Sequence, residues 1–488
     1  MERGNRKLQY LTAFVVSIGA VTTGVSMNWN TPVIPKFHDN ETNFHLTEGQ
    51  LSWMAAISSP GFMTGSLASR FTSDKYGRRA TILGSALPVI IGTVLIARTA
   101  NVWLLYIGKI LWGCGGGIFS TVSSIYLAEI ADKEIRGSLT VMLRYMLYFG
   151  CFLVMTIGPL VSYQNLNYTI LALPISFFAA CWCIPETPYY YLKEGEVNKA
   201  RKVLKRLTKC KEDEVLEDRL SQMRSDVKKE MSRSGSLKEL FTGKEYRKAL
   251  IILLGLKLTQ IMSGSNAIAQ YLGRITQESN TSLNVSTALI IFGAVRFVLG
   301  VMSSALVDRL GRRPLLIYSY FGTGLSLIGV GAYFFKQQVF GRGDEQYGVY
   351  GYIPFIGINL ASIMSSLGFQ SVVALITAEI FPINVKFLAM TLSNILGGLL
   401  NFTTVKSYQN LKDFAGLCGV FWFYAFVSFI GAVFSFIIVP ETKGKSLREI
   451  QVILQGDVYD EAAENLNKVR EEKYVKVLEG NVPEGKDG

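Results

Sequence analysis

Twelve stretches of mostly apolar residues follow one another along the chain, and each is close to the roughly 20 residues that a helix needs to cross a membrane. Hydrophobic residues make up 49% of the 488 positions, and the mean hydropathy is positive, both unusual for a soluble domain. We therefore predict an all-α membrane protein with twelve transmembrane helices. The predicted spans cover 9–34, 51–71, 80–98, 102–128, 138–162, 168–184, 249–272, 286–307, 314–335, 350–378, 387–407 and 416–439.

Basic residues gather in segments that all fall on one predicted side of the membrane. Seventeen Lys and Arg residues lie between Lys193 and Lys248, and others occur in "DKYGRR" (74–79) and "DRLGRR" (308–313). The positive-inside rule makes this side, with both termini, cytoplasmic. We expect a plasma-membrane protein in contact with the lipid bilayer. A nucleic-acid partner is disfavoured, because the charges of the basic segment are mixed and its aromatic residues are few.

Glycosylation sequons provide a second indication of the topology. Four of them fall in loops predicted to face outward, and none falls in a predicted cytoplasmic loop. A fifth, at Asn401, lies inside a predicted span, where it is not usable. The predicted glycosylation sites are Asn40, Asn167, Asn280 and Asn284.

Three motifs occur twice in the same order, which indicates an internal duplication. "DKYGRR" recurs as "DRLGRR", "AEIADKEIR" (128–136) as "AEIFPINVK" (378–386), and "PETP" (185–188) as "PETK" (440–443). We predict two pseudo-symmetric six-helix halves, 1–184 and 249–446, joined by a cytoplasmic linker of short amphipathic helices at 185–248 and followed by a tail at 447–488. In transporters built from such parallel halves the substrate path runs between them, near the middle of the bilayer.

The repeated motifs place acidic and basic side chains at the cytoplasmic ends of matching helices. We predict that they form ion pairs that close in one conformation and break in another, and we expect Glu129 to pair with Arg136 and Glu379 with Lys386. Positive-inside charge alone explains the bases but not the recurring acids. The predicted gate residues are Asp74, Arg78, Arg79, Glu129, Arg136 and Glu186 in the first half, and Asp308, Arg312, Arg313, Glu379, Lys386 and Glu441 in the second.

The order of these motifs resembles that of the sugar porters of the major facilitator superfamily, over about residues 9–450. Within that group, "NWNTPVIPKF" (28–37) resembles the first-span exit of insect facilitated trehalose transporters. The resemblance implies facilitative transport of a sugar such as trehalose or a hexose by alternating access.

The resemblance also implies a central sugar site. The family signature of helix 7 reads "QIMSGSN" here, so Gln260 and Asn266 keep amides that offer both a donor and an acceptor to a sugar hydroxyl. Hydrogen bonding between helices is the alternative role for these two amides. The substrate-binding residues that the resemblance implies are Gln260, Asn266, Asn401, Arg144, Trp29 and Gln370.

Two departures from the family pattern bear on mechanism. Helix 10 reads "QSVVA" (370–374) and lacks the prolines and the tryptophan of the family, which predicts the loss of a flexible gate element and of an apolar sugar platform. Proton-coupled relatives carry an Asp in helix 1 where this chain has Thr22 or Thr23. The missing carboxylate favours facilitated diffusion over symport.

Three basic residues, Arg144, Lys257 and Arg296, fall deep inside predicted spans that contain no Asp or Glu. Because a cation facing lipid is costly, they should face water or the bundle interior. Either backbone carbonyls, water and amides solvate them, or the cavity is electropositive and takes an anionic or phosphorylated solute.

Enzymatic function is not indicated, because the sequence has no nucleophile–base set and no phosphate-binding loop. His38 and His45 share one loop without further ligands, so we expect neither a metal nor a cofactor. We predict a carrier of a small-molecule solute that works as a monomer. A carrier for anionic solutes and a non-transporting solute sensor are the alternatives.

Overall fold

The computed structural model describes residues 6–455 except positions 40, 43, 133, 209–212, 233–236, 244–245, 280, 282, 340–347, 382 and 446. Throughout this described part, the regular structure is helical.

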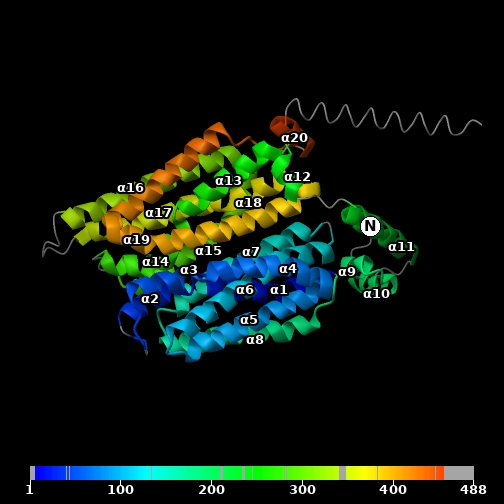
Figure 1. Cartoon of the computed structure of the whole chain (residues 1–488), viewed down its shortest axis with the longest axis horizontal. Helices are drawn as coiled ribbons and strands as arrows, with labels where there is room; N and C mark the ends of the chain where they lie inside the picture. The colour runs from blue at the N-terminus through cyan, green and yellow to red at the C-terminus, as the bar shows by residue number, and fades with distance from the viewer. Residues whose placement is uncertain are drawn as a thin grey trace, which may run out of the picture.

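The first group of helices forms one bundle in Figure 1. Its members are α1 (Arg6–Asn28), α2 (Asn30–His38), α3 (Glu48–Ala56), α4 (Ser58–Tyr76), α5 (Arg78–Arg98), α6 (Val102–Ile130), α7 (Arg136–Ile157) and α8 (Tyr163–Ala180). A short 3₁₀ turn, η1 (Cys181–Cys183), closes α8. α1 with α2 and α3 with α4 each make one long interrupted helix, since a single residue separates their members.

The second group lies alongside the first. Its members are α13 (Arg247–Met262), α14 (Ser265–Glu278), α15 (Val285–Leu310), α16 (Arg312–Val339), η3 (Gly348–Tyr352), α17 (Ile353–Leu367), α18 (Phe369–Ile380) and α19 (Ile383–Ile437). Gly416 interrupts the 55-residue α19 with φ 68°, outside the helical region.

Ten helical stretches of the described residues are long and apolar enough to span a membrane. One of them, Leu388–Ile437, contains the interruption at Gly416 and supplies two spans. The α3–α4 pair is too polar to qualify, yet α4 packs along α6 inside the bundle. Together these helices give the twelve spans predicted from the sequence.

Short helices gather at one end of the two groups (Figure 1). They are α9 (Pro188–Lys193), α10 (Val197–Thr208), α11 (Asp213–Ser232), α12 (Leu237–Thr242) and α20 (Leu447–Gln455). Leu192, Leu204 and Leu220 form a small core among α9–α11, which gives each of these short helices a buried face. We call this the linker end, and the end with α2, α3 and α14 the opposite end.

The two groups meet where α2 packs on α14 and α15, where α3 and α4 pack on α19, and where α7 packs on α15. A continuous apolar core runs through both groups near the opposite end and includes Trp29, Trp112 and Tyr424. These contacts surround the site described next.

Candidate functional site

A cavity of about 390 Å³ lies between the two helix groups. Its wall comes from α1, α4, α5, α6 and α7 of the first group and from α13, α14, α15, α18 and α19 of the second. Most of the polar atoms on the wall belong to hydroxyls and amides, among them those of Thr22, Ser59 and Gln270. The volume falls in the range of pockets that bind small molecules, and such groups suit a ligand rich in hydroxyls.

Three predicted substrate-binding residues, Asn266, Asn401 and Gln370, line this cavity. Asn266 Nδ2 donates to Asn401 Oδ1 at 3.1 Å, and Asn401 Nδ2 donates to Ser59 Oγ at 2.9 Å. This chain of polar side chains joins α14, α19 and α4, and so crosses from one helix group to the other.

Trp29 does not line the cavity, and this part of the predicted site is wrong. Its side chain is completely buried, and its Nε1 donates to Asn167 Oδ1 at 2.9 Å. Asn167 is therefore buried as well, inside α8, where no glycan fits, so the predicted glycosylation there is also wrong. Asn284 is exposed just before α15 and stays a prediction, whereas Asn40 and Asn280 lie outside the described residues.

Gln260 is also absent from the cavity wall, because its side chain faces a break between α17 and α18. Its Nε2 donates to the carbonyl oxygen of Phe369 at 3.2 Å, which matches the alternative role of hydrogen bonding between helices. The break lies at Gly368 (φ −109°, ψ −103°), where an added Cβ would come within 2.1 Å of the Ser319 side chain. Helix 10 therefore has an interruption although it lacks the prolines, and the expected loss of a flexible gate element stays a prediction.

Arg144 is half-buried on α7 and is not among the residues that line the cavity. It shares a helix face with Tyr148 and Cys151, which do line it, but it lies one turn closer to the linker end. The prediction that Arg144 contacts solute inside the cavity is wrong for this conformation.

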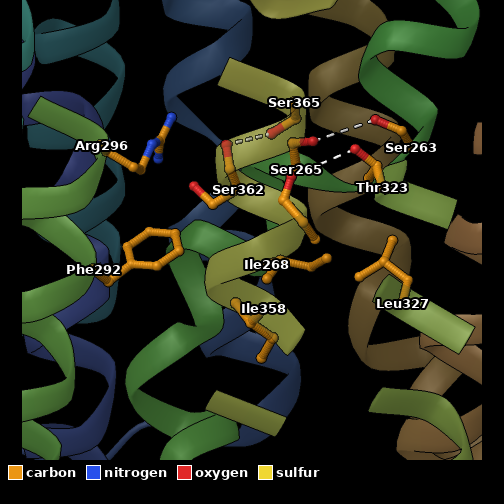
Figure 2. A pocket seen from close by; sticks show the side chains of 11 residues that line it. Ser263, Ser265, Ile268, Phe292, Arg296, Thr323, Leu327, Ile358, Ser362 and Ser365 are labelled. Carbon is orange, nitrogen blue, oxygen red and sulfur yellow. Dashed lines mark hydrogen bonds between the residues drawn. The ribbon is translucent and has the colours of Figure 1, made fainter. Parts of the chain in front are cut away.

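Lys257 and Arg296, the other two deep cations, do line the cavity. Arg296 also borders a second, small cavity of about 20 Å³, which has room for one water molecule. Figure 2 shows Arg296 at one side of this pocket, whose wall also includes Ser265, Ser362 and Ser365. No Asp or Glu occurs on either wall as far as the structure describes them.

Sequence reasoning missed a fourth intramembrane cation, Lys109. Its side chain is fully buried in α6, and its Nζ donates to Asn30 Oδ1 at 2.8 Å. The rings of Trp29 and Trp112 lie 4.8 and 5.2 Å from the ammonium nitrogen. A single base inside the apolar run "YIGKILWG" was the available signal, the same signal that singled out Arg144.

Hydrogen bonds between the two helix groups close the opposite end. Asn30 Nδ2 donates to Gln270 Oε1 at 2.8 Å, and Thr31 Oγ1 donates to the Ala269 carbonyl at 2.9 Å. Lys406 Nζ donates to a serine hydroxyl of α3 at 2.6 Å. The cavity is therefore sealed toward this end, which the sequence did not predict.

Ion pairs at the linker end of the first group follow the repeated motifs. Arg78 Nε lies 3.2 Å from Glu129 Oε1, and Lys193 Nζ lies 2.8 Å from Asp74 Oδ1. Glu186 accepts from the backbone N–H groups of Arg78 and Arg79 at 3.0–3.1 Å.

The second group repeats this arrangement. Arg312 Nη2 lies 3.1 Å from Glu379 Oε1, and Glu441 accepts from the backbone N–H groups of Arg312 and Arg313 at 3.0 and 2.9 Å. The side chains of Asp308 and Lys386, two predicted gate residues, lie outside the described residues. The motif that recurs in the sequence therefore recurs as a structure.

The predicted pair of Glu129 with Arg136 is wrong. α6 ends at Ile130, the chain then turns through an extended Ala131, and Arg136 starts α7 as an exposed residue. Within the described part of the chain Arg136 has no ion pair, and Glu129 pairs with Arg78. The pairs named above for both groups also stay within their own group, so none of them bridges the two.

Glu186 and Glu441 occupy matching positions but differ in burial, and this difference predicts opposite responses to pH. Burial raises the pKa of Glu186 above its usual value despite hydrogen bonds from the N–H groups of Thr187, Arg79 and Arg78. Burial also tends to raise the pKa of Glu441. Hydrogen bonds from the N–H groups of Lys443, Arg312, Arg313 and Thr442 outweigh that effect, so the pKa of Glu441 is lowered.

The Glu441→Gln variant should lose about 1 kcal/mol of stability near neutral pH, because it removes a charged acceptor. A lowered pKa means that this contribution disappears as the pH falls through the folded-state pKa of Glu441. For Glu186, wild type should instead gain stability relative to Glu186→Gln as the pH falls through the raised pKa. Melting temperatures of both variants and wild type in detergent, from about pH 7 down to about pH 3, measure this, and the same trend in both variants would contradict it.

Comparison with known proteins finds relatives along almost the whole chain. Residues 8–454 match the family model described as sugar (and other) transporter. The facilitated trehalose transporter Tret1 of Bombyx mori is 31% identical over 449 residues, covering 91% of this chain and 86% of that protein. Tret1 of Apis mellifera ligustica is 30% identical over 453 residues, covering 92% and 89%.

Among solved structures, the inward-open conformation of the xylose transporter XylE from E. coli matches with a TM-score of 0.73 and 20% sequence identity. The match covers 91% of this chain and 99% of that one. The proton:xylose symporter XylE bound to 6-bromo-6-deoxy-D-glucose matches with a TM-score of 0.71 and 19% identity, covering 92% and 100%. These matches confirm the predicted twelve-helix fold.

Proposed function

Because this chain belongs to the sugar transporter family of the major facilitator superfamily, we propose that it carries a sugar across a membrane by facilitated alternating access, with trehalose as the first candidate. It is a multi-pass membrane transporter of that family and not an enzyme. The trehalose proposal draws on the relatives named above, which are facilitated trehalose transporters.

The observation that carries the proposal is the cavity between the two helix groups. Its amides and hydroxyls are chemically suited to a sugar, and it is sealed toward the opposite end by Asn30–Gln270 and Thr31–Ala269. Alternating access requires such a site with one end closed. Opening toward the opposite end would break these bonds and close the linker end.

Facilitated diffusion is supported by the chemistry of the cavity wall. No carboxylate is present among the described residues that line it, and Thr22 and Thr23 occupy the first-helix positions where a proton carrier would be expected. A proton gradient should therefore have no effect on transport.

The proposed topology places the linker end and both termini in the cytoplasm, in a plasma-membrane protein that works as a monomer with no nucleic-acid partner. The basic segments at that end support this placement. In this view residues 1–184 and 249–446 are the two moving halves, and the ion pairs of each half hold its helix ends together during the movement.

Uptake of labelled trehalose and glucose into proteoliposomes tests the proposal. We expect equilibration down the gradient at a rate independent of an imposed pH gradient. Asn266→Ala should reduce uptake about tenfold by removing a hydrogen-bonding amide from the cavity, while Asn284→Ala, on the surface, is the matched control. Binding without flux would instead support the sensor alternative.

A further inference from the structure

Two uncompensated cations lie on the wall of the cavity. Lys257 comes from α13 and Arg296 from α15, so both belong to the second helix group. Neither makes an ion pair or a hydrogen bond with any residue that the structure describes. Arg296 has one aromatic contact, since its guanidinium carbon lies 5.7 Å from the centre of the Phe292 ring.

Lys109 shows how this protein holds a cation that has a structural role. Its ammonium is enclosed by Trp29 and Trp112, donates to Asn30 and has no exposed surface. Lys257 and Arg296 have no such enclosure and face the cavity instead. Since a cation without partners in the membrane interior is costly, placing two of them at a solute site indicates a role toward the solute.

The surroundings of Arg296 also favour an anion. The small cavity that Arg296 also borders is lined by side chains that include Ser265 and Ser362 and has room for one water molecule (Figure 2). A guanidinium presents several N–H groups in one plane, a geometry that matches a carboxylate or a phosphate.

We propose that the cavity binds a sugar that carries an anionic group, a carboxylate or a phosphate, paired with Lys257 and Arg296. The hydroxyls of the same sugar then face the amides of Asn266 and Asn401. This inference rests on the proposed sugar transport and names a charged sugar as the substrate in place of trehalose, which is neutral. A neutral sugar of the same size would displace water from both cations without replacing the lost interactions, and would therefore bind less tightly.

The proposal is tested by measuring equilibrium binding and proteoliposome uptake. Each is measured with glucose, trehalose, glucuronate and glucose 6-phosphate. We expect at least one of the two anionic sugars to bind about tenfold or more tightly than glucose and to be taken up. Glucuronate and glucose 6-phosphate distinguish a carboxylate from a phosphate. Uptake of neutral sugars with no preference for either anion overturns this inference and leaves the proposed function intact, whereas no uptake of any of the four overturns both.

Four variants assign the preference to particular residues. Arg296→Gln and Lys257→Gln should each reduce the affinity for the anionic sugar about tenfold or more, and neither should reduce the affinity for glucose. A melting temperature in detergent close to that of wild type shows that the variant is folded, and Arg296→Lys should recover part of the preference. Arg144→Gln removes a cation of α7 outside the cavity and should keep the preference for the anionic sugar over glucose. The proposed site is wrong if Arg144→Gln loses this preference and Arg296→Gln keeps it.

Discussion

Arg78→Gln is expected to destabilise the protein by about 3 kcal/mol, the largest effect among the motif residues at the linker end. The Arg78 and Glu129 side chains are only 12% and 14% exposed, so removing the arginine leaves a largely buried carboxylate without its counterion. The variant also loses the bond from Arg78 Nη1 to the Ser73 carbonyl. Thermal unfolding in detergent should show a melting temperature several degrees below that of wild type.

Arg136→Gln is the matched control, because Arg136 is the partner that sequence spacing suggests for Glu129. It is exposed and has no ion pair within the described residues, so its loss should change stability by less than about 0.5 kcal/mol. The double variant Arg78→Gln/Glu129→Gln should be more stable than Arg78→Gln alone, since it removes the unpaired charge. Equal losses for Arg78→Gln and Arg136→Gln would contradict the observed pairing.

The repeated motifs could be recognised in the sequence. Which of their residues form ion pairs with one another could not be predicted from it. Seven positions along a continuous helix would place Glu129 and Arg136 on one face, two turns apart. The extended Ala131 ends that helix, and α5 instead brings Arg78 to Glu129 from 51 positions away. Contacts between helices depend on packing, which local spacing does not encode.

The same limit explains which of the predicted site residues line the cavity and which do not. The twelve spans follow from length and hydropathy alone, whereas a cavity wall depends on how each helix is rotated. Gln260 and Asn266 belong to one motif, but Gly264 lies between them with φ +78° and interrupts the helix. The helical spacing before Gly264 therefore does not predict the direction of the side chains after it. Asn266 therefore reaches the cavity, while Gln260 reaches the backbone of Phe369.

Gly264→Ala is expected to remove most transport activity and to destabilise the protein by about 2–5 kcal/mol. A left-handed φ of +78° is strained for any residue with a Cβ, and the added Cβ would lie 2.2 Å from the ring of Tyr424. Tyr424 is almost fully buried and has little room to move. Relief of the clash must shift the start of α14, which carries Asn266 into the cavity. Uptake should fall about 100-fold, as expected for displacement of a positioned group by about 1 Å.

The Gly195→Ala variant separates the effect of backbone strain from the effect of the clash with Tyr424. Gly195 has nearly the same backbone angle, φ +80°, but an added Cβ would meet nothing within 4 Å. It should therefore show only the backbone strain of about 1–2 kcal/mol, with transport close to wild type. If Gly195→Ala lowers uptake as much as Gly264→Ala does, general destabilisation explains the loss. If only Gly264→Ala loses uptake at a temperature where both variants are folded, we conclude that the contact with Tyr424 sets the position of Asn266. The two variants have the same backbone strain and differ in that contact.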